Sequence, residues 1–247
     1  MKLRILIWFS CGDASAVAAK LALEKYKGYE THILYCDTGG EHEDNKRFLQ
    51  ECEGWYSHKI EILKSEKYAD HFDVFEKTKY IAGIAGARCT TELKKVLRFA
   101  YQEIDDIQVF GYTVEERNRA KRFNLSFPEV ITDFILIEQG LKKEHCHAIV
   151  ESAGIEIPAM YKLGYDNNNC IGCPKGGAGY WNKIRVDFPE VFLRMCLISR
   201  KLKVKLIVYK GQRIYLDELP EGYGNTKSEP KISCDFVCQS VIEAQNV

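Results

Sequence analysis

Small and polar residues follow an apolar run near the N-terminus, and their chemistry suits a phosphate. The run Ile5–Phe9 leads into a six-residue segment, and a helix-forming stretch comes next. The segment consists of Ser10, Cys11, Gly12, Asp13, Ala14 and Ser15. A turn from a strand into a helix aims several backbone N–H groups at one point, beside the positive end of the helix dipole. The serine hydroxyls add donors, and the glycine lets a ligand approach the backbone. We predict a phosphate site here, with a strand–helix connection capped by serine as the alternative.

A Cys-x-x-Cys pair, Cys170 and Cys173, stands in a glycine-rich loop and has the spacing of metal or cluster ligands. Further ligands are expected among Cys89, Cys234 and Cys238. Four sulfurs would hold zinc in a closed structural site, and cysteines from distant segments equally suit a 4Fe-4S cluster. A redox dithiol is the alternative, although that use favours a helix N-terminus in a thioredoxin-like unit.

Two further polar segments follow expected strands. Asp37 and Thr38 end the second strand, where a doubly wound sheet contacts the ribose or base of a nucleotide. The stretch 111–122 follows the fourth strand and carries four cations within six residues, and arginine binds phosphate or sulfate through paired hydrogen bonds. Its candidate ligand-binding residues are Gly111, Tyr112, Arg117, Arg119 and Arg122. A capped polar turn and a solvated helix face with Glu–Arg pairs are the respective alternatives.

Strand-like and helix-like segments alternate over residues 1–157, which are expected to form a nucleotide-binding α/β domain. Strands are expected at 3–9, 31–36, 57–63, 107–111 and 133–137, and helices at 14–26, 43–53, 92–104, 115–123 and 142–153, with 64–87 less regular. This alternation predicts a parallel sheet with helices on both faces and ligands at the carboxyl ends of its strands. Residues 158–247 are expected to form a Cys-rich extension packed on it, with helices over 179–201 separated near Pro189 and a hairpin within 205–216.

Composition narrows the class of protein. Lys plus Arg and Asp plus Glu number 35 each, so net charge does not indicate a nucleic-acid partner. No apolar stretch approaches the roughly 18 residues that span a membrane. We find no secretory signal and expect a cytoplasmic protein, in which ten cysteines stay reduced. Clustered cysteines then favour metal binding, whereas isolated ones such as Cys52 and Cys146 are expected in the core.

Together these motifs resemble the PP-loop proteins of the adenine-nucleotide alpha-hydrolase superfamily, and within it the phosphoadenosine phosphosulfate (PAPS) reductase-like proteins of phage and mobile elements. The matching segments fall in family order over roughly residues 3–200. They are 10–15, 36–39, Arg88-Cys89-Thr90-x-x-Leu93-Lys94, 111–122 and 170–173. The resemblance implies a five-stranded parallel sheet that binds an adenine nucleotide over its strand ends. The nucleotide would be ATP with magnesium, or PAPS or adenylylsulfate, and several branches carry a 4Fe-4S cluster.

Residue roles also follow from the resemblance. Ser10, Ser15, Lys94 and Arg117 become candidates for the chemistry at the phosphate or sulfate. Cys234 becomes a candidate nucleophile of the reductase type, although its surroundings only distantly match the reductase motif. Two further departures concern the metals. Ala14 stands where the ATP pyrophosphatases have a magnesium-binding aspartate, with Asp13 one position away, and Cys89 stands where reductases have a Cys-Cys pair.

Three functions are consistent with these observations. The first is an ATP pyrophosphatase or adenylylating enzyme that supports sulfur transfer to nucleic acid, in DNA phosphorothioation or tRNA thiolation. A cysteine desulfurase or other sulfur donor would be its partner. The second is a PAPS or adenylylsulfate reductase. The third is a catalytically inert nucleotide-binding scaffold with zinc on its cysteines, which Ala14 favours. A homodimer is compatible with all three.

Overall fold

The computed structural model describes residues 3–83, 86–229, 231–232 and 234. The chain divides into two compact units. Unit 1 comprises segments 1–37, 42–64 and 97–168, and unit 2 comprises 38–41, 65–96 and 169–247. Segments 38–41 and 65–96 therefore belong with the later part of the chain, whereas the sequence-based boundary at residue 157 left them in the first domain. Sequence order did not reveal this grouping, because the contacts that create it join residues far apart in the chain.

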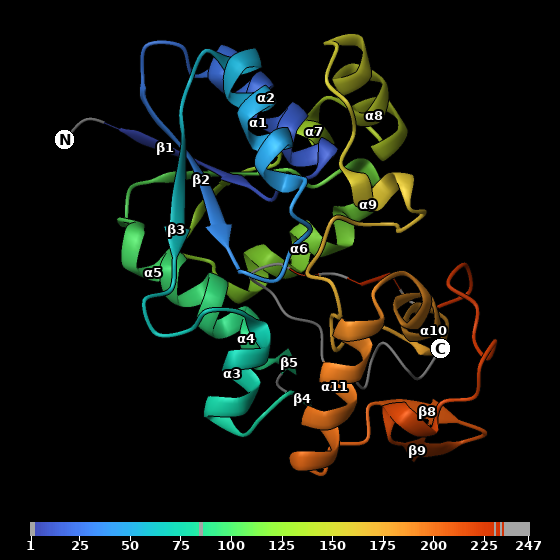
Figure 1. The fold of residues 1–247 in the computed structure, drawn as a ribbon. Coiled ribbons are helices and arrows are strands. Elements are labelled where there is room, and N and C mark those ends of the chain that lie inside the picture. The colour runs from blue at the N-terminus through green and yellow to red at the C-terminus, as the bar shows by residue number, and fades with distance from the viewer. Residues whose placement is uncertain (1–2, 84–85, 230, 233, 235–247) are drawn as a thin grey trace. The chain divides into compact units, whose positions relative to one another are not determined.

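Five parallel strands form the sheet of unit 1, which confirms the expected α/β fold (Figure 1). They are β1 (Arg4–Phe9), β2 (Glu30–Asp37), β3 (Ile60–Lys64), β6 (Ile107–Phe110) and β7 (Ile131–Asp133), in the order β3-β2-β1-β6-β7. The chain passes from β1 to β2 and β3 on one side, and β6 and β7 lie on the other side. The loops that follow β1 and β6 therefore meet where the strand order reverses, which is where open α/β sheets bind ligands.

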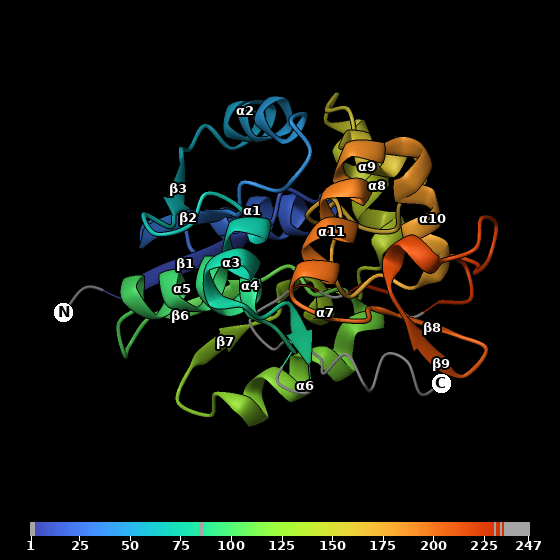
Figure 2. The same cartoon turned by 60° about the horizontal axis from the view of Figure 1, so that its bottom comes forward.

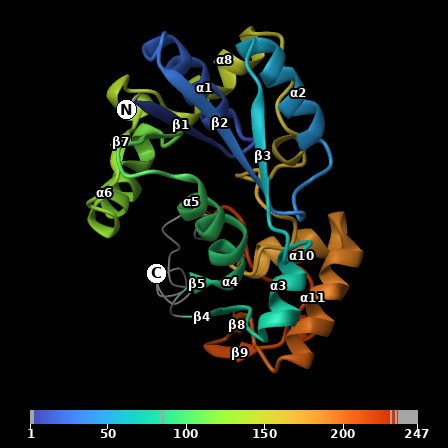
Figure 3. The same cartoon turned by 90° about the vertical axis from the view of Figure 1, so that its left-hand side faces the viewer.

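Helices cover both faces of this sheet (Figure 3). Side chains of successive strand residues alternate between faces, so Ile5, Ile7 and Phe9 join a core with the helices of one face. On the other face, Phe110 packs on Phe123 with ring centroids 4.6 Å apart. The first face carries α1 (Asp13–Lys25), α2 (Asn45–Tyr56), α7 (Ile135–Glu138) and α8 (Lys143–Ser152), and the second carries α5 (Val96–Tyr101) and α6 (Arg117–Ser126). A 3-10 turn, η2 (Val114–Glu116), precedes α6, and a short helix, α9 (Ala159–Lys162), follows α8.

The expected strand at 133–137 was wrong. The strand ends at Asp133, and residues 135–138 form α7. Asp133 accepts hydrogen bonds from the side chains of Lys25 and Tyr26 at 2.8 and 2.7 Å, and Ile135 then turns into the core against α1. A short apolar run fits a buried helix as well as a strand, so periodicity could not separate them.

Unit 2 is mainly helical, and α10 contacts α11, which in turn contacts α3 (Figure 2). Helix α3 was not expected; its start signal is Asp70, whose side chain accepts a 2.7 Å hydrogen bond from the Asp73 amide. The break at Pro189 and the hairpin are confirmed. The elements are α3 (His71–Thr78), β4 (Ala82–Gly83), β5 (Gly86–Ala87), α4 (Arg88–Thr90), the π-helical turn η1 (Thr91–Lys95), α10 (Ala178–Asp187), α11 (Pro189–Lys201), β8 (Ile207–Tyr209), β9 (Gln212–Ile214) and η3 (Leu216–Glu218). Among the helices that the structure describes, none has the length and apolar character needed to cross a bilayer.

Candidate functional site

The loop between β1 and α1 is organised around the hydroxyl of Ser15. This oxygen accepts hydrogen bonds from the backbone N–H groups of Ser10 and Gly12 at 3.0 and 3.3 Å, and the Ser10 hydroxyl lies 3.1 Å from it. It donates in turn to the Gly12 carbonyl at 2.8 Å. Gly12 is extended and immediately precedes α1. The donors that the sequence suggested for a phosphate therefore lie together at a helix N-terminus.

Buried amides hold the middle of this loop in place. Cys11 is fully buried and has a left-handed backbone, with φ of +54°. Its carbonyl accepts a 2.6 Å hydrogen bond from Asn168 Nδ2, which also donates to Asn45 Oδ1 at 2.7 Å. The sequence analysis missed both asparagines, although a run of three asparagines was visible before the Cys-x-x-Cys pair.

Gly111 sits at the end of β6, directly against the first turn of α1. A Cβ atom at this position would lie 2.7 Å from Ser15 Cα, 2.8 Å from Ser15 N and 3.1 Å from the Ala14 carbonyl carbon. These are backbone atoms, so no side-chain rotation can relieve the overlap. The absence of a side chain at Gly111 is therefore what allows the loops after β1 and β6 to meet.

Asp13 has its carboxylate in the interior of unit 1 and is only 1% exposed. It accepts a 3.0 Å hydrogen bond from Tyr161, and its other oxygen lies 3.1 Å from His147 Nε2. Burial, reinforced by the Asp13 carboxylate, raises the pKa of Tyr161 well above its usual value. Asp13 is therefore paired with protein groups, and the structure gives no support to its replacing the aspartate missing at Ala14. Asp37, at the end of β2, is partly exposed and lies 3.4 Å from Lys64.

The cationic segment after β6 divides into two parts. The Arg119 guanidinium stacks over the ring of Tyr112, 4.5 Å from its centroid, and pairs with Glu116. Tyr112 is buried next to Gly111, so Arg119 is held beside the end of β6. Arg117 and Arg122 are exposed on α6. Arg119 therefore lies beside the end of β6, and the Glu–Arg pairing considered as an alternative occurs for this residue.

The Cys170–Cys173 loop belongs to unit 2, and the hydroxyl of Tyr180 organises it. This oxygen accepts hydrogen bonds from the amides of Gly172 and Cys173 at 2.9 and 3.0 Å, and it lies 3.4 Å from the Cys170 carbonyl, to which it donates. The Ile171 amide donates to the Gly40 carbonyl at 2.8 Å. Helix α10 and the segment 38–41 together fix the loop.

Replacing Tyr180 by phenylalanine is expected to destabilise the protein by about 1–3 kcal/mol, because two buried amides would lose their acceptor. The ring would remain, so packing would change little. Urea unfolding measures the effect, and Tyr209→Phe, on the partly exposed β8, is the matched control. Equal losses in the two variants would contradict the organising role of the hydroxyl.

The four described candidate cysteines lie in unit 2. Burial raises the pKa of the Cys170 thiol well above its usual value, and nearby Glu41, Cys234 and Cys89 raise it further, against the opposing effect of Lys94. Cys89 and Cys173 are buried as well. Cys234 lies 3.9 Å from the Thr90 hydroxyl. Cys89 and Cys234 thus approach Cys170, although they are 81 and 64 positions away from it in the sequence. Cys238 lies outside the described residues.

These thiols fit a zinc ion or a 4Fe-4S cluster in donor type and number. Their burial would also keep water from the group. In the described part of the chain, no three side chains of His, Cys, Asp or Glu form a ready metal site. A metal or cluster on these cysteines is therefore a matter for proposal.

A buried polar cluster adjoins Cys170. The Thr38 hydroxyl lies 3.0 Å from Cys170 Sγ and donates to Glu41 at 3.4 Å, and Lys94 Nζ lies 4.0 Å from the same Glu41 oxygen. Lys94 projects from the π-helical turn η1, a rare conformation that is often found at functional sites. Thr38 and Lys94, which the sequence linked to nucleotide chemistry, therefore lie in unit 2 near a cysteine.

His71 packs against Gly40, which belongs to segment 38–41 of unit 2. It is 1% exposed, its ring stacks 4.1 Å from that of Phe72, and a Cβ atom on Gly40 would lie 2.2 Å from its Nδ1. Burial lowers the pKa of His71 to about 4. The imidazole is therefore neutral in the folded protein at neutral pH.

We expect this histidine to make the protein less stable in mild acid. His71 takes up a proton near pH 6.5 in the unfolded chain but only near pH 4 in the folded chain. The free energy of unfolding therefore has its full value above about pH 6.5 and falls by about 1.4 kcal/mol per pH unit as the pH drops from there to about 4. Urea unfolding at about pH 7 and pH 5 tests this. His71→Gln, which cannot titrate, should lose less stability than the wild type over the same interval; equal losses would contradict the assignment.

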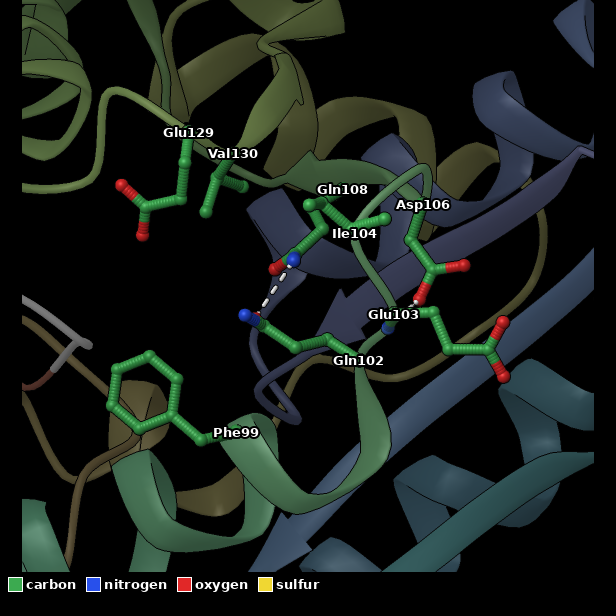
Figure 4. A pocket seen from close by; sticks show the side chains of 8 residues that line it. All are labelled: Phe99, Gln102, Glu103, Ile104, Asp106, Gln108, Glu129 and Val130. Carbon is green, nitrogen blue, oxygen red and sulfur yellow. Dashed lines mark hydrogen bonds between the residues drawn. The ribbon is translucent and has the colours of Figure 1, made fainter.

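A pocket lies at the opposite edge of the sheet, at the amino ends of β6 and β7 (Figure 4). In it, Gln108 Nε2 donates to Gln102 Oε1 at 2.9 Å, and the carboxylate of Asp106 accepts from the Glu103 amide at 2.6 Å. Because open α/β sheets bind their ligands at the carboxyl ends of the strands, we do not place the nucleotide here.

No family model matches the chain. An uncharacterized protein of Methanocaldococcus jannaschii is 25% identical over 196 residues, which are 78% of this chain and 40% of that protein. The chain thus spans about two fifths of the length of the curated relative that it matches.

The similar solved structures include the following three. A PAPS reductase from Candida auris, in complex with phosphate, is 11% identical over 67% of this chain and 80% of its own, with a TM-score of 0.48. The U34-tRNA thiolase NcsA of Methanococcus maripaludis, with its 4Fe-4S cluster, is 15% identical, and the match covers 100% of this chain and 81% of the thiolase, with a TM-score of 0.45. A predicted subunit of tRNA methyltransferase from Methanocaldococcus jannaschii is 12% identical, and the match covers 60% of this chain and 74% of that subunit, with a TM-score of 0.37.

Proposed function

We propose that this chain is an adenine-nucleotide-dependent enzyme of sulfur chemistry. Unit 1 would bind ATP, and the cysteines of unit 2 would handle the sulfur that is transferred to a nucleic acid. The observation that carries the proposal is the loop after β1, where the Ser15 hydroxyl gathers two amides and Gly111 closes on the first turn of α1. At the reversal of strand order this combination supports a phosphate site, in which the amides that donate to Ser15 in this structure would donate to phosphate oxygens instead.

The loop would hold the phosphates of ATP. Its amides and the hydroxyls of Ser10 and Ser15 would take the place of water around the phosphate oxygens, at the positive end of α1. Asp37 would accept from the ribose hydroxyls at the end of β2. Arg119, whose guanidinium stacks on Tyr112 beside Gly111, would neutralise phosphate charge.

The reaction we propose is adenylylation. An oxygen of the acceptor attacks the α-phosphorus, a bond from that oxygen to phosphorus forms, and the bond to the bridging oxygen of the leaving pyrophosphate breaks. Positioned donors would stabilise the charge that develops on the phosphoryl oxygens. Magnesium, when bound, would neutralise the leaving pyrophosphate. Asp13 would not hold it, because its carboxylate is paired with Tyr161 and His147.

The cysteines would supply the sulfur side of the reaction, in which sulfide attacks the activated atom of the acceptor and the bond to the adenylylated oxygen breaks, so that AMP leaves. Cys89, Cys170 and Cys173 would hold a 4Fe-4S cluster, and a cluster with these three protein ligands has one iron available for sulfide. Cys234 or Cys238 as a fourth ligand would close that position. Thr38, 3.0 Å from Cys170 Sγ, would hydrogen-bond a ligating thiolate, and Lys94 would offset its charge. With zinc instead, the site would be structural.

Anaerobically purified protein tests the proposal. We expect iron, labile sulfide and turnover of ATP to AMP and pyrophosphate. Ser15→Ala should reduce that turnover by at least tenfold, whereas Ser152→Ala, at an exposed serine on α8, should leave it unchanged. Protein that binds no ATP would refute it. Protein that binds ATP without turnover and contains zinc and no iron would refute it and leave the scaffold function.

A sulfonucleotide reductase is the second candidate, because Cys234 is partly exposed in the same unit as Cys170. Its thiolate would attack the sulfur of PAPS or adenylylsulfate, displacing the nucleotide phosphate oxygen, and a dithiol reductant of the thioredoxin class would then release sulfite. Sulfite formation that is lost in Cys234→Ser would establish this activity in place of the first.

A further inference from the structure

A cationic and aromatic cavity of about 660 Å³ lies within unit 2. Lys67, Tyr68, Lys77, Tyr80 and Arg88 contribute its charged and aromatic side chains. Among the described residues that line it, none is acidic. Its volume is in the range of pockets that hold small ligands, and the lining combines positive charge with flat rings.

The rings and the cations are arranged together. Lys67 Nζ and Lys77 Nζ lie 5.0 and 5.6 Å from the centroid of the Tyr68 ring, which is buried and forms a fixed wall. Tyr80 is 39% exposed as a residue, so solvent reaches it at the cavity. A ligand that enters would meet an aromatic surface and ammonium groups at the same time.

Ion pairs hold two of the cations in position. Arg88 pairs with Glu92 at 2.6 Å, and Lys77 pairs with Asp73 at 2.8 Å. These carboxylates offset part of the positive charge. The guanidinium has five N–H donors and the ammonium three, so each pair leaves donors for a second anion. The Lys67 side chain is exposed to solvent, and its ammonium group adds an adaptable positive charge.

The cavity adjoins the cysteine-bearing segment along the chain. Strand β5 (Gly86–Ala87) lines it, Arg88 follows, and the next residue is Cys89. Thr91, the first residue of the π-helical turn that carries Lys94, also lines it. A group bound there would therefore lie beside the segment that supplies one of the candidate cluster ligands.

We propose that this cavity binds one nucleotide of a single-stranded segment of the acceptor nucleic acid, with the base stacked on Tyr80 and the phosphate held by Lys67 and Arg88. Stacking on aromatic rings combined with a cationic groove is how proteins bind unpaired nucleotides. The assignment rests on the proposed function, for which it names the acceptor site.

Fluorescence anisotropy with a labelled single-stranded RNA of about ten nucleotides tests this on the full chain without ATP. We expect Tyr80→Ala to weaken binding by roughly tenfold or more and Tyr80→Phe to bind like the wild type, because the stacking face is kept. Lys67→Ala should weaken binding. It should also reduce the slope of log binding constant against log salt concentration by about one, because one fewer phosphate contact is made. Lys227→Ala, an exposed lysine elsewhere in unit 2, is the matched control.

Wild-type affinity in both Tyr80→Ala and Lys67→Ala would overturn the proposal. So would competition by free AMP at concentrations equal to those of the RNA, which would indicate a mononucleotide site. Binding of a labelled ATP analogue is measured separately. If Ser15→Ala and wild type bind ATP equally while the cavity variants lose RNA, the proposed nucleotide site fails and the cavity assignment stands.

Discussion

Replacing Gly111 by alanine is expected to remove nucleotide binding almost completely. The added methyl group would lie 2.7 Å from Ser15 Cα and 2.8 Å from Ser15 N, so the end of β6 and the first turn of α1 must separate. That movement breaks the geometry in which Ser15 holds the Ser10 and Gly12 amides. We expect ATP affinity to fall by more than tenfold and the free energy of unfolding by about 1–3 kcal/mol, as for other overpacked sites.

Calorimetric titration with ATP and urea unfolding measure the two effects. Gly54→Ala is the matched control, because a Cβ atom there meets nothing within 4 Å and the position lies inside helix α2. It should leave ATP binding unchanged and raise stability slightly, since alanine favours helix by about 1 kcal/mol over glycine. Wild-type affinity in Gly111→Ala would show that ATP does not use this loop.

Replacing Cys170 by serine is expected to abolish binding of the iron–sulfur cluster. Cys170 has the central position among the candidate ligands, since Cys89 and Cys234 both influence its ionisation and Thr38 contacts its sulfur. Serine has almost the same size but replaces the soft thiolate that iron–sulfur clusters require. We expect iron and labile sulfide to fall to background and the visible absorption to disappear.

The control is Cys196→Ala, which removes another buried cysteine of the same unit from helix α11. It should retain the iron of the wild type. Metal analysis and visible spectra of anaerobic preparations make the comparison. Full iron content in Cys170→Ser would exclude this loop as the cluster site, whereas zinc in the wild type, lost in the variant, would identify a structural zinc site.

The sequence by itself determined the α/β architecture and predicted a phosphate site in the loop after β1. Strand and helix periods are local properties, and Ser10, Gly12 and Ser15 carry their hydrogen-bonding chemistry within six residues. It failed at 133–137 because a short apolar run does not distinguish a strand from a buried helical turn. The Cys-x-x-Cys pair was also visible, since its spacing is local.

The tertiary structure decided which distant residues support these motifs. Only packing shows that Gly111 must lack a side chain, that Asn168 holds the Cys11 carbonyl, and that Tyr180 fixes the cysteine loop. It also groups residues 65–96 with the C-terminal segment in one unit. These contacts join residues far apart in the chain, and their geometry depends on how whole elements pack rather than on any local pattern.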